Sequence, residues 1–215
     1  MKKEVDRSRR TLLTAIVAGA ALAPLAKANA QEAHKWGMIV DLNRCFGCQS
    51  CTLACRSALP LKGLWRTKIL EKEIGLRPTF TPMLCQQCPM PDCLPVCPEN
   101  ALIRDASGIV RVVSERCVGC GQCVSACRYG MISLFEKKAY KCELCTEIEM
   151  GPPCVESCAS HARLFGDFLH PTGDFAKALQ DPTLAPIEGS PKEAVIFYIP
   201  LVEGGAICKT GDARL

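Results

Sequence analysis

Apolar residues along this chain come in short runs, none of which shows a long helical or strand period. The run Trp36–Leu42 predicts a strand. Two β-branched runs, Ala101–Arg104 and Ile109–Val113, flank the turn residues Asp105–Gly108 and predict a β-hairpin. Further short strands are predicted at Tyr129–Phe135 and Ala162–Phe168, and Glu193–Pro200 is expected to form a late strand or a docking edge. The pattern indicates a small α+β fold.

The polar stretches between these runs are predicted to be mostly irregular. Thr52–Leu59 reads as a short helix that ends before Pro60, because the residue before a proline avoids the helical region. A polar linking stretch is then expected to reach Pro82, and Asp181–Pro191 is expected to run extended over the surface.

The N-terminus has the pattern of an export signal. Basic residues precede an apolar run from Thr11 to Ala26, which is too short and too rich in alanine for a good membrane span. Ser8-Arg9-Arg10-Thr11-Leu12-Leu13 matches the twin-arginine signal, and small residues offer cleavage sites up to Ala30. We expect residues 1–30 to be cleaved and the mature protein to lie in the periplasm or on the outer face of the cytoplasmic membrane.

Cysteine dominates the chemistry of the remaining chain. Sixteen of the seventeen cysteines form four groups of four. The first and third groups have the spacing C-x2-C-x2-C-x3-C of bacterial ferredoxins, while the second has x4 and the fourth x8 in its middle gap. The groups are Cys45, Cys48, Cys51 and Cys55; Cys85, Cys88, Cys93 and Cys97; Cys117, Cys120, Cys123 and Cys127; and Cys142, Cys145, Cys154 and Cys158.

This spacing suits a [4Fe–4S] cluster for a geometric reason. Three sulfurs within a few residues reach three corners of one cube only if the backbone curls tightly, and Gly47, Gly119 and Gly121 supply the freedom to do so. The fourth cysteine of such a run ligates the other cluster of a pair. Sixteen thiolates therefore predict four [4Fe–4S] clusters, in one two-cluster ferredoxin unit nested inside another.

Charge and export narrow the function further. The formal net charge is +4, but the predicted leader holds six basic and two acidic residues, so the mature chain has twenty of each. Four clusters of charge 2− would bring it to about −8, which argues against a nucleic-acid partner. The twin-arginine route carries folded proteins, so clusters inserted beforehand would keep the thiols from forming disulfides.

Other interpretations of the cysteines and histidines stay open at this point. Paired C-x-x-C motifs also bind zinc, although zinc sites rarely place four cysteines within eleven residues. No nucleophile–base pair, phosphate loop or open metal site points to an enzyme. His161 could donate a hydrogen bond to a cluster sulfur or simply occupy a loop, and Cys208 is left over as a free or buried thiol.

The chain resembles a known family over about residues 36–199. The resemblance lies in the order of the four cysteine groups, in Gly130 after Tyr129, and in the segments Leu164–Phe168 and Gly189–Ile199. This family is the four-cluster iron–sulfur subunits of dimethyl-sulfoxide-reductase-type complexes, which serve molybdenum or tungsten enzymes. The resemblance implies four ligand sets. They are Cys45, Cys48, Cys51 with Cys158; Cys142, Cys145, Cys154 with Cys55; Cys85, Cys88, Cys93 with Cys127; and Cys117, Cys120, Cys123 with Cys97.

The same resemblance implies the organisation and the function. Residues 31–84 and 136–170 would form the outer ferredoxin unit, 85–135 the inner one and 171–215 a docking tail. The first-motif cluster would lie toward the catalytic subunit and the fourth-motif cluster toward the membrane. The chain would not be an enzyme itself. It would pass electrons between a membrane quinol-oxidising subunit and a molybdopterin-type catalytic subunit, or alternatively shuttle them as a free periplasmic polyferredoxin.

Overall fold

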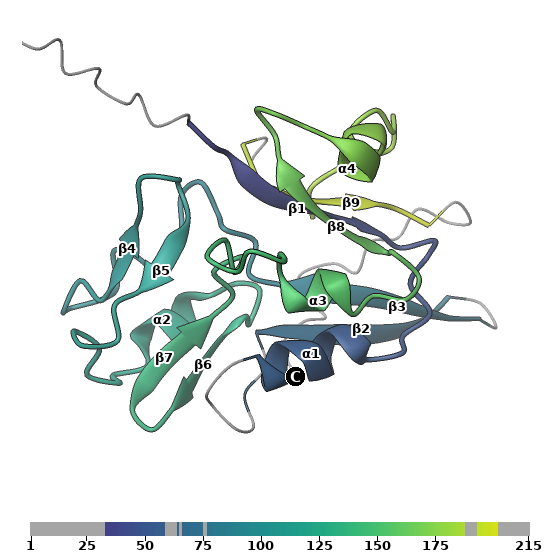
Figure 1. Ribbon diagram of the computed structural model, residues 1–215. Coiled ribbons are helices and arrows are strands. Elements are labelled where there is room, and N and C mark those ends of the chain that lie inside the picture. Colours follow the sequence, from purple (N-terminus) through teal and green to yellow (C-terminus); the bar gives the residue numbers. More distant parts are fainter. Residues whose placement is uncertain (1–32, 59–63, 65, 75–76, 188–192, 202–215) are drawn as a thin grey trace, which may run out of the picture. The chain divides into compact units, whose positions relative to one another are not determined.

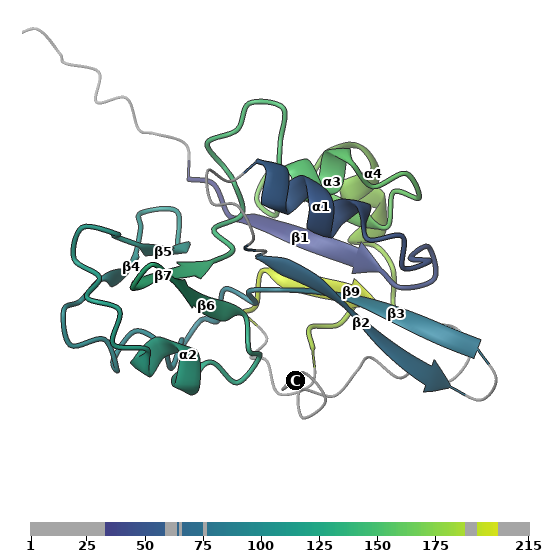
Figure 2. The ribbon, with the colours of Figure 1, turned by 90° about the horizontal axis from the view of Figure 1, so that it is seen from below.

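The computed structural model describes residues 33–58, 64, 66–74, 77–187 and 193–201, which belong to one compact unit. The predicted leader and Cys208 lie outside the described residues. The elements are short, as the sequence pattern indicates (Figures 1 and 2).

A three-stranded sheet joins the two ends of the described chain. Strand β1 (Trp36–Asp41) pairs antiparallel with β8 (Arg163–Asp167) and parallel with β9 (Ile196–Ile199). Each of these three strands was predicted from the sequence, and each is confirmed. Because β9 belongs to this sheet, part of the predicted tail contributes to the fold itself. The short helix α4 (Gly173–Ala178) contacts β8 (Figure 1).

The expected linking stretch before Pro82 is wrong, since it forms a second sheet. Strands β2 (Thr67–Ile74) and β3 (Arg77–Leu84) pair antiparallel along their whole length. Pro78 and Pro82 weaken a strand pattern. They are tolerated here because this sheet has two strands among the described residues, so each strand keeps one edge that pairs with no other described strand. Thr67, Leu70 and Met83 are buried and tie this sheet to the core.

Two small hairpins follow. The predicted hairpin is confirmed as β4 (Leu102–Arg104) and β5 (Val110–Val112), and the Asp105 carboxylate accepts hydrogen bonds from the backbone of Ser107 and Ile109 in its turn. The second consists of β6 (Ile132–Phe135), which was predicted, and β7 (Lys138–Lys141), which was not.

Three further helices are very short, and each carries at least one cysteine. They are α1 (Ser50–Ser57), α2 (Gln122–Ala126) and α3 (Pro153–Glu156). The first matches the helix expected at 52–59. Helices α1 and α3 pack against each other, which brings the first and fourth cysteine groups together (Figure 2).

The largest buried cluster combines ordinary apolar residues with cysteines. It includes Met38, Val40 and Leu84 together with thiols of the first, second and fourth groups. This protein, which has few aromatic residues, thus uses cysteines as part of its core. None of the described helices is both long and apolar enough to cross a membrane.

The contact between β1 and its neighbours leads to a stability prediction. A Cβ atom on Gly37 would lie 2.2 Å from the backbone oxygen of Val195 and 2.2 Å from the Phe168 ring. Gly37→Ala should therefore lower the free energy of unfolding by about 1–3 kcal/mol through overpacking, measured by denaturation of the cluster-loaded protein. Gly108→Ala is the control, because nothing lies within 4 Å of its Cβ and only its positive φ opposes the change. Equal losses in both variants would contradict the steric explanation.

Candidate iron–sulfur centres

Three cavities are each lined by four cysteines drawn from two different groups. The second and third groups exchange their fourth cysteines, and the fourth group takes up Cys55 from the first. The sets are Cys55, Cys142, Cys145 and Cys154; Cys85, Cys88, Cys93 and Cys127; and Cys97, Cys117, Cys120 and Cys123.

Three of the four remaining cysteines, Cys45, Cys51 and Cys158, are neighbours. The thiol of Cys45 lies close enough to those of Cys51 and Cys158 that both raise its pKa, although burial raises it most. Cys48 is exposed, and its thiol is 3.4 Å from the Ser50 hydroxyl. The described residues contain sixteen cysteines, all of them free thiols.

Short helical turns divide each cysteine pair between two sites. The third and fourth cysteines of every motif are four residues apart, on or beside one turn. In the second motif, Cys93 lines one cavity and Cys97 the next. In the third motif, Cys123 lines the cavity of its own motif and Cys127 lines the cavity of the second motif. Each such turn therefore belongs to two neighbouring sites at once.

The backbone repeats the same curl in all four motifs. The residue directly before the second cysteine has a positive φ in each: 75° at Gly47, 47° at Gln87, 76° at Gly119 and 62° at Leu144. Only two of these residues are glycines, so sequence reasoning identified the curl in the first and third motifs and missed it in the others. A non-glycine residue is held in this region only when its surroundings compensate for the strain.

The surroundings of Gln87 and Leu144 explain how the curl is kept. Both side chains are buried, at 2% and 1% exposure. The Gln87 amide donates to the carbonyl oxygen of Cys142 at 2.8 Å and accepts from the backbone of Val110 at 2.8 Å. Gln87 thus ties the second motif to the start of the fourth.

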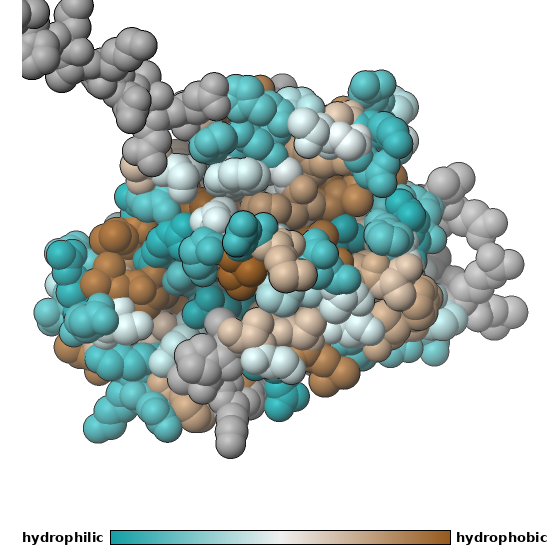
Figure 3. Space-filling view, viewed as in Figure 1, coloured by the Kyte–Doolittle hydropathy of each residue, from teal (hydrophilic) through white to brown (hydrophobic). Residues whose placement is uncertain are grey.

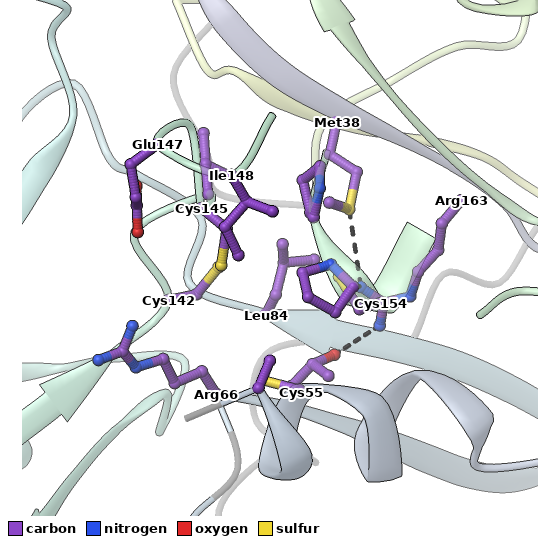
Figure 4. Close-up of a pocket in the computed structure, with 15 residues that line it drawn as sticks. Met38, Cys55, Arg66, Leu84, Cys142, Cys145, Glu147, Ile148, Cys154 and Arg163 are labelled. Atoms are coloured by element: carbon purple, nitrogen blue, oxygen red, sulfur yellow. Dashed lines mark hydrogen bonds between the residues drawn. The ribbon is translucent and has the colours of Figure 1, made fainter. Parts of the chain in front are cut away.

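The cavity of the fourth motif is lined by positively charged side chains as well as by cysteines. Cys55 reaches it from α1, Cys154 from α3, and Cys142 and Cys145 from the loop that follows β7 (Figure 4). Arg66 and Arg163 also line this cavity. Two guanidinium groups beside four thiols fit a group that carries negative charge.

Buried thiols in this arrangement are poor acids on their own. Burial, reinforced by neighbouring cysteines, raises the pKa of Cys88 and Cys145 to about 11 and that of Cys93 to about 12. Burial also raises the pKa of Cys142 and Cys154. A bound metal reverses this preference, because a coordinating thiol loses its proton outright. These sites therefore favour thiolates only when iron supplies the positive charge.

Backbone N–H groups add support to the sulfurs. The amide of Ala101 donates to the Cys97 sulfur at 3.2 Å, that of Ala139 to Cys117 at 3.3 Å, and that of Met131 to Cys127 at 3.4 Å. Hydrogen bonds to ligand sulfurs stabilise negative charge on a cluster and help to set its potential. The all-cysteine donor sets, the curled loops and these N–H donors fit [4Fe–4S] clusters.

The cavities form a row in which the fourth motif is internal. The second and fourth cavities meet where Leu84 is followed by Cys85 and Lys141 by Cys142. On the other side, Cys51 of the first motif contributes to the raised pKa of Cys154. The order is therefore first, fourth, second, third. The fourth-motif site therefore has a neighbour on each side and does not lie at an end of the row, and the expectation that its cluster lies toward the membrane stays a prediction.

No histidine among the described residues lines any of the three cysteine cavities. His161 is exposed and adopts a positive φ in the turn after Cys158, where its backbone N–H donates to the Cys158 carbonyl oxygen at 2.9 Å. His34 and His170 both hydrogen-bond the carboxylate of Asp167, which joins the segment before β1 to the end of β8.

Comparison with known proteins agrees with this geometry. Residues 76–168 match the 4Fe-4S dicluster domain. The sequence is 35% identical to a subunit of the tetrathionate reductase of Salmonella typhimurium, over 92% of its own length and 90% of that protein. It is 34% identical to a chain of the polysulfide reductase of Wolinella succinogenes (80% and 98%) and 36% identical to the protein NrfC of Escherichia coli K12 (82% and 87%).

These matches decide between the metals and between the classes of protein. They favour [4Fe–4S] clusters over zinc, and an electron-transfer subunit over an enzyme in its own right. This protein belongs to the family of iron–sulfur electron-transfer subunits of molybdopterin-type reductase complexes.

Proposed function

We propose that this chain conducts single electrons through four [4Fe–4S] clusters between a membrane quinol-oxidising subunit and a molybdopterin-type catalytic subunit. The observation that carries the proposal is the row of four-cysteine sites, each built from two motifs. Relatives named as parts of reductases favour this role over that of a free polyferredoxin. When bound, the clusters supply one-electron redox chemistry, while the protein holds them in order and sets their charge environment.

The ligand sets proposed are those that the family resemblance implies. Three of them are supported by the cavities that their cysteines line, and the fourth by the proximity of Cys45, Cys51 and Cys158. Exchange of the fourth cysteine within each pair of motifs supports a nested, pseudo-two-fold arrangement. Residues 85–135 would form the inner ferredoxin unit, and 31–84 with 136–170 the outer one.

The two ends of the row offer the routes by which electrons enter and leave. Among the described cysteines only Cys48 and Cys120 are exposed, and they belong to the first and third motifs, at opposite ends. Exposed apolar side chains accompany each: Phe46 (59%) at one end and Val118 (58%) at the other. Figure 3 shows hydrophobic residues gathered over the part that carries β4 and β5. We assign the first-motif end to the catalytic subunit and the third-motif end to the membrane subunit.

The proposed location is the periplasm or the outer face of the cytoplasmic membrane, reached by the twin-arginine route. Its support is the sequence of residues 8–13 and the need to protect sixteen thiols by inserting clusters before export. Membrane attachment would then come through the partner subunit, with the segment 171–215 assisting in docking.

Ligand exchange between motifs can be tested with three cysteine variants. Cys55→Ser and Cys145→Ser lie in different motifs but one proposed site, so both should abolish the same electron paramagnetic resonance signal. Cys51→Ser lies in the motif of Cys55 but should abolish a different signal. Each should reduce the iron content from about sixteen atoms per chain by about four. Cys208→Ser, outside all four sets, is the matched control; loss of one shared signal in Cys51→Ser and Cys55→Ser would refute the exchange.

The assignment of the two ends can be tested with surface variants in the assembled complex. Phe46→Asp should weaken association with the catalytic subunit about tenfold, which is about 1.4 kcal/mol, and leave association with the membrane subunit unchanged. Val118→Asp should do the opposite. Leu169→Asp is the control, since Leu169 is similarly exposed at 52% and lies in neither motif. Co-purification of each partner gives the readout, and a reversed pattern would invert the assignment.

The export proposal predicts a specific effect of the arginine pair. Arg9→Lys together with Arg10→Lys should leave the cluster-loaded precursor in the cytoplasm and abolish cleavage near Ala30. Cell fractionation with detection of the chain measures this. Arg7→Lys is the control and should be exported normally; export of the double variant at the same rate would argue against the twin-arginine route.

A further inference from the structure

A buried arginine lies where the first- and fourth-motif sites meet. Arg163, the first residue of β8, is 2% exposed. One terminal nitrogen of its guanidinium is 3.8 Å from the Cys154 sulfur and 3.6 Å from the Met38 sulfur, and the other donates to the Thr67 hydroxyl (Figure 4). The Thr67 hydroxyl in turn donates its proton to the Met83 carbonyl oxygen at 2.7 Å, so the Thr67 oxygen is the acceptor in its bond with Arg163.

This guanidinium has no carboxylate to balance its charge within the described part of the chain. Glu147 lines the same cavity, but it is exposed and pairs with Arg111 at 3.6 Å. The Nε atom of Arg163 is buried and has no hydrogen-bond partner among the described residues. Removing a cation from water without an anion is expensive, so a protein keeps one only where a negative group compensates.

The negative groups within reach are ligands of two different sites. Cys154 and Cys142 belong to the fourth-motif set, and Cys51 belongs to the first-motif set; all three interact electrostatically with Arg163. The guanidinium therefore faces both cluster positions rather than one.

A second buried cation occupies the next junction of the row. Lys141 is 1% exposed, and its ammonium group donates to the carbonyl oxygens of Val110 and Cys142. It lines the second-motif cavity and acts on Cys93 there, while its chain neighbour Cys142 lines the fourth-motif cavity. No ion pair with a carboxylate involves it among the described residues.

We infer that Arg163 and Lys141 are the internal counter-ions of the cluster row, Arg163 shared by the first- and fourth-motif clusters and Lys141 by the fourth- and second-motif clusters. Each cation favours the more negative, reduced state of the clusters beside it and so raises their reduction potentials. It also weakens the repulsion that an electron on one cluster exerts on its neighbour. The fourth-motif cluster, with a cation on each side, gains the most.

This inference rests on the proposed ligand sets, and iron content separates a failure of those sets from a failure of the inference. The experiment uses the complete complex, titrated electrochemically with each cluster followed by electron paramagnetic resonance. Arg163→Met should keep about sixteen irons and make reduction of the first- and fourth-motif clusters at least tenfold less favourable, about 59 mV for one electron. Lys141→Met should shift the fourth- and second-motif clusters instead. Arg163→Lys, which keeps the positive charge, should hold the potentials of both clusters close to their wild-type values.

Lys177→Met is the matched control, because it removes one positive charge from an exposed side chain paired with Asp174. It should move no potential. If Arg163→Met keeps its iron but shifts no cluster, or shifts all four equally, the inference is overturned. If Arg163→Met loses iron, assembly restored by Arg163→Lys but not by Arg163→Gln supports the role of charge. Failure of Arg163→Lys as well would show that shape alone matters and would overturn it.

Discussion

The constraint on which this structure depends is that each of the three cysteine-lined cavities takes its four thiols from two segments far apart in the chain. A short turn carries two cysteines four residues apart and sends one to each of two neighbouring sites. Forming one site therefore also positions a cysteine of its neighbour. Helices of four to eight residues, which would be marginal alone, are held in place by these shared positions and by the packing of α1 on α3.

The second constraint on the fold is the burial of ionisable thiols and of positively charged side chains. Thiols gathered in apolar surroundings resist ionisation, and isolated cations such as Arg163 and Lys141 resist burial. A cluster with its thiolates resolves both, since iron compensates the sulfurs and the remaining negative charge faces the buried cations. Cofactor insertion and folding are thus linked, which is compatible with the proposed export of the folded, cluster-loaded protein.

Much of this arrangement could be predicted from the sequence, where local chemistry dictates local shape. The spacing of the cysteines identified the cluster sites, and the β-branched runs around Asp105–Gly108 identified a hairpin. The sheet β2–β3 was missed because its prolines weaken the strand pattern. Strand β7 was missed because its short run contains two lysines, one of which is buried.

The features that the sequence could not predict depend on contacts between distant residues. The positive φ of Leu144 and Gln87 is enforced by burial and, for Gln87, by bonds to Cys142 and Val110. The order of the sites likewise follows from the contact of Leu84 and Cys85 with Lys141 and Cys142, across some 57 residues of chain. Arg163 is the first residue of a strand, and its neighbours in the sequence do not distinguish it from a surface charge. It is buried only because β8 joins the sheet with β1 and β9.

The most direct test of this account is a map of anomalous scattering at the iron absorption edge, from crystals of the complex grown without oxygen. We predict four clusters within this chain, in the order of first, fourth, second and third motif, each bound by three cysteines of one motif and the fourth cysteine of its partner. Fewer than four clusters, or any cluster held by the four cysteines of a single motif, would contradict it.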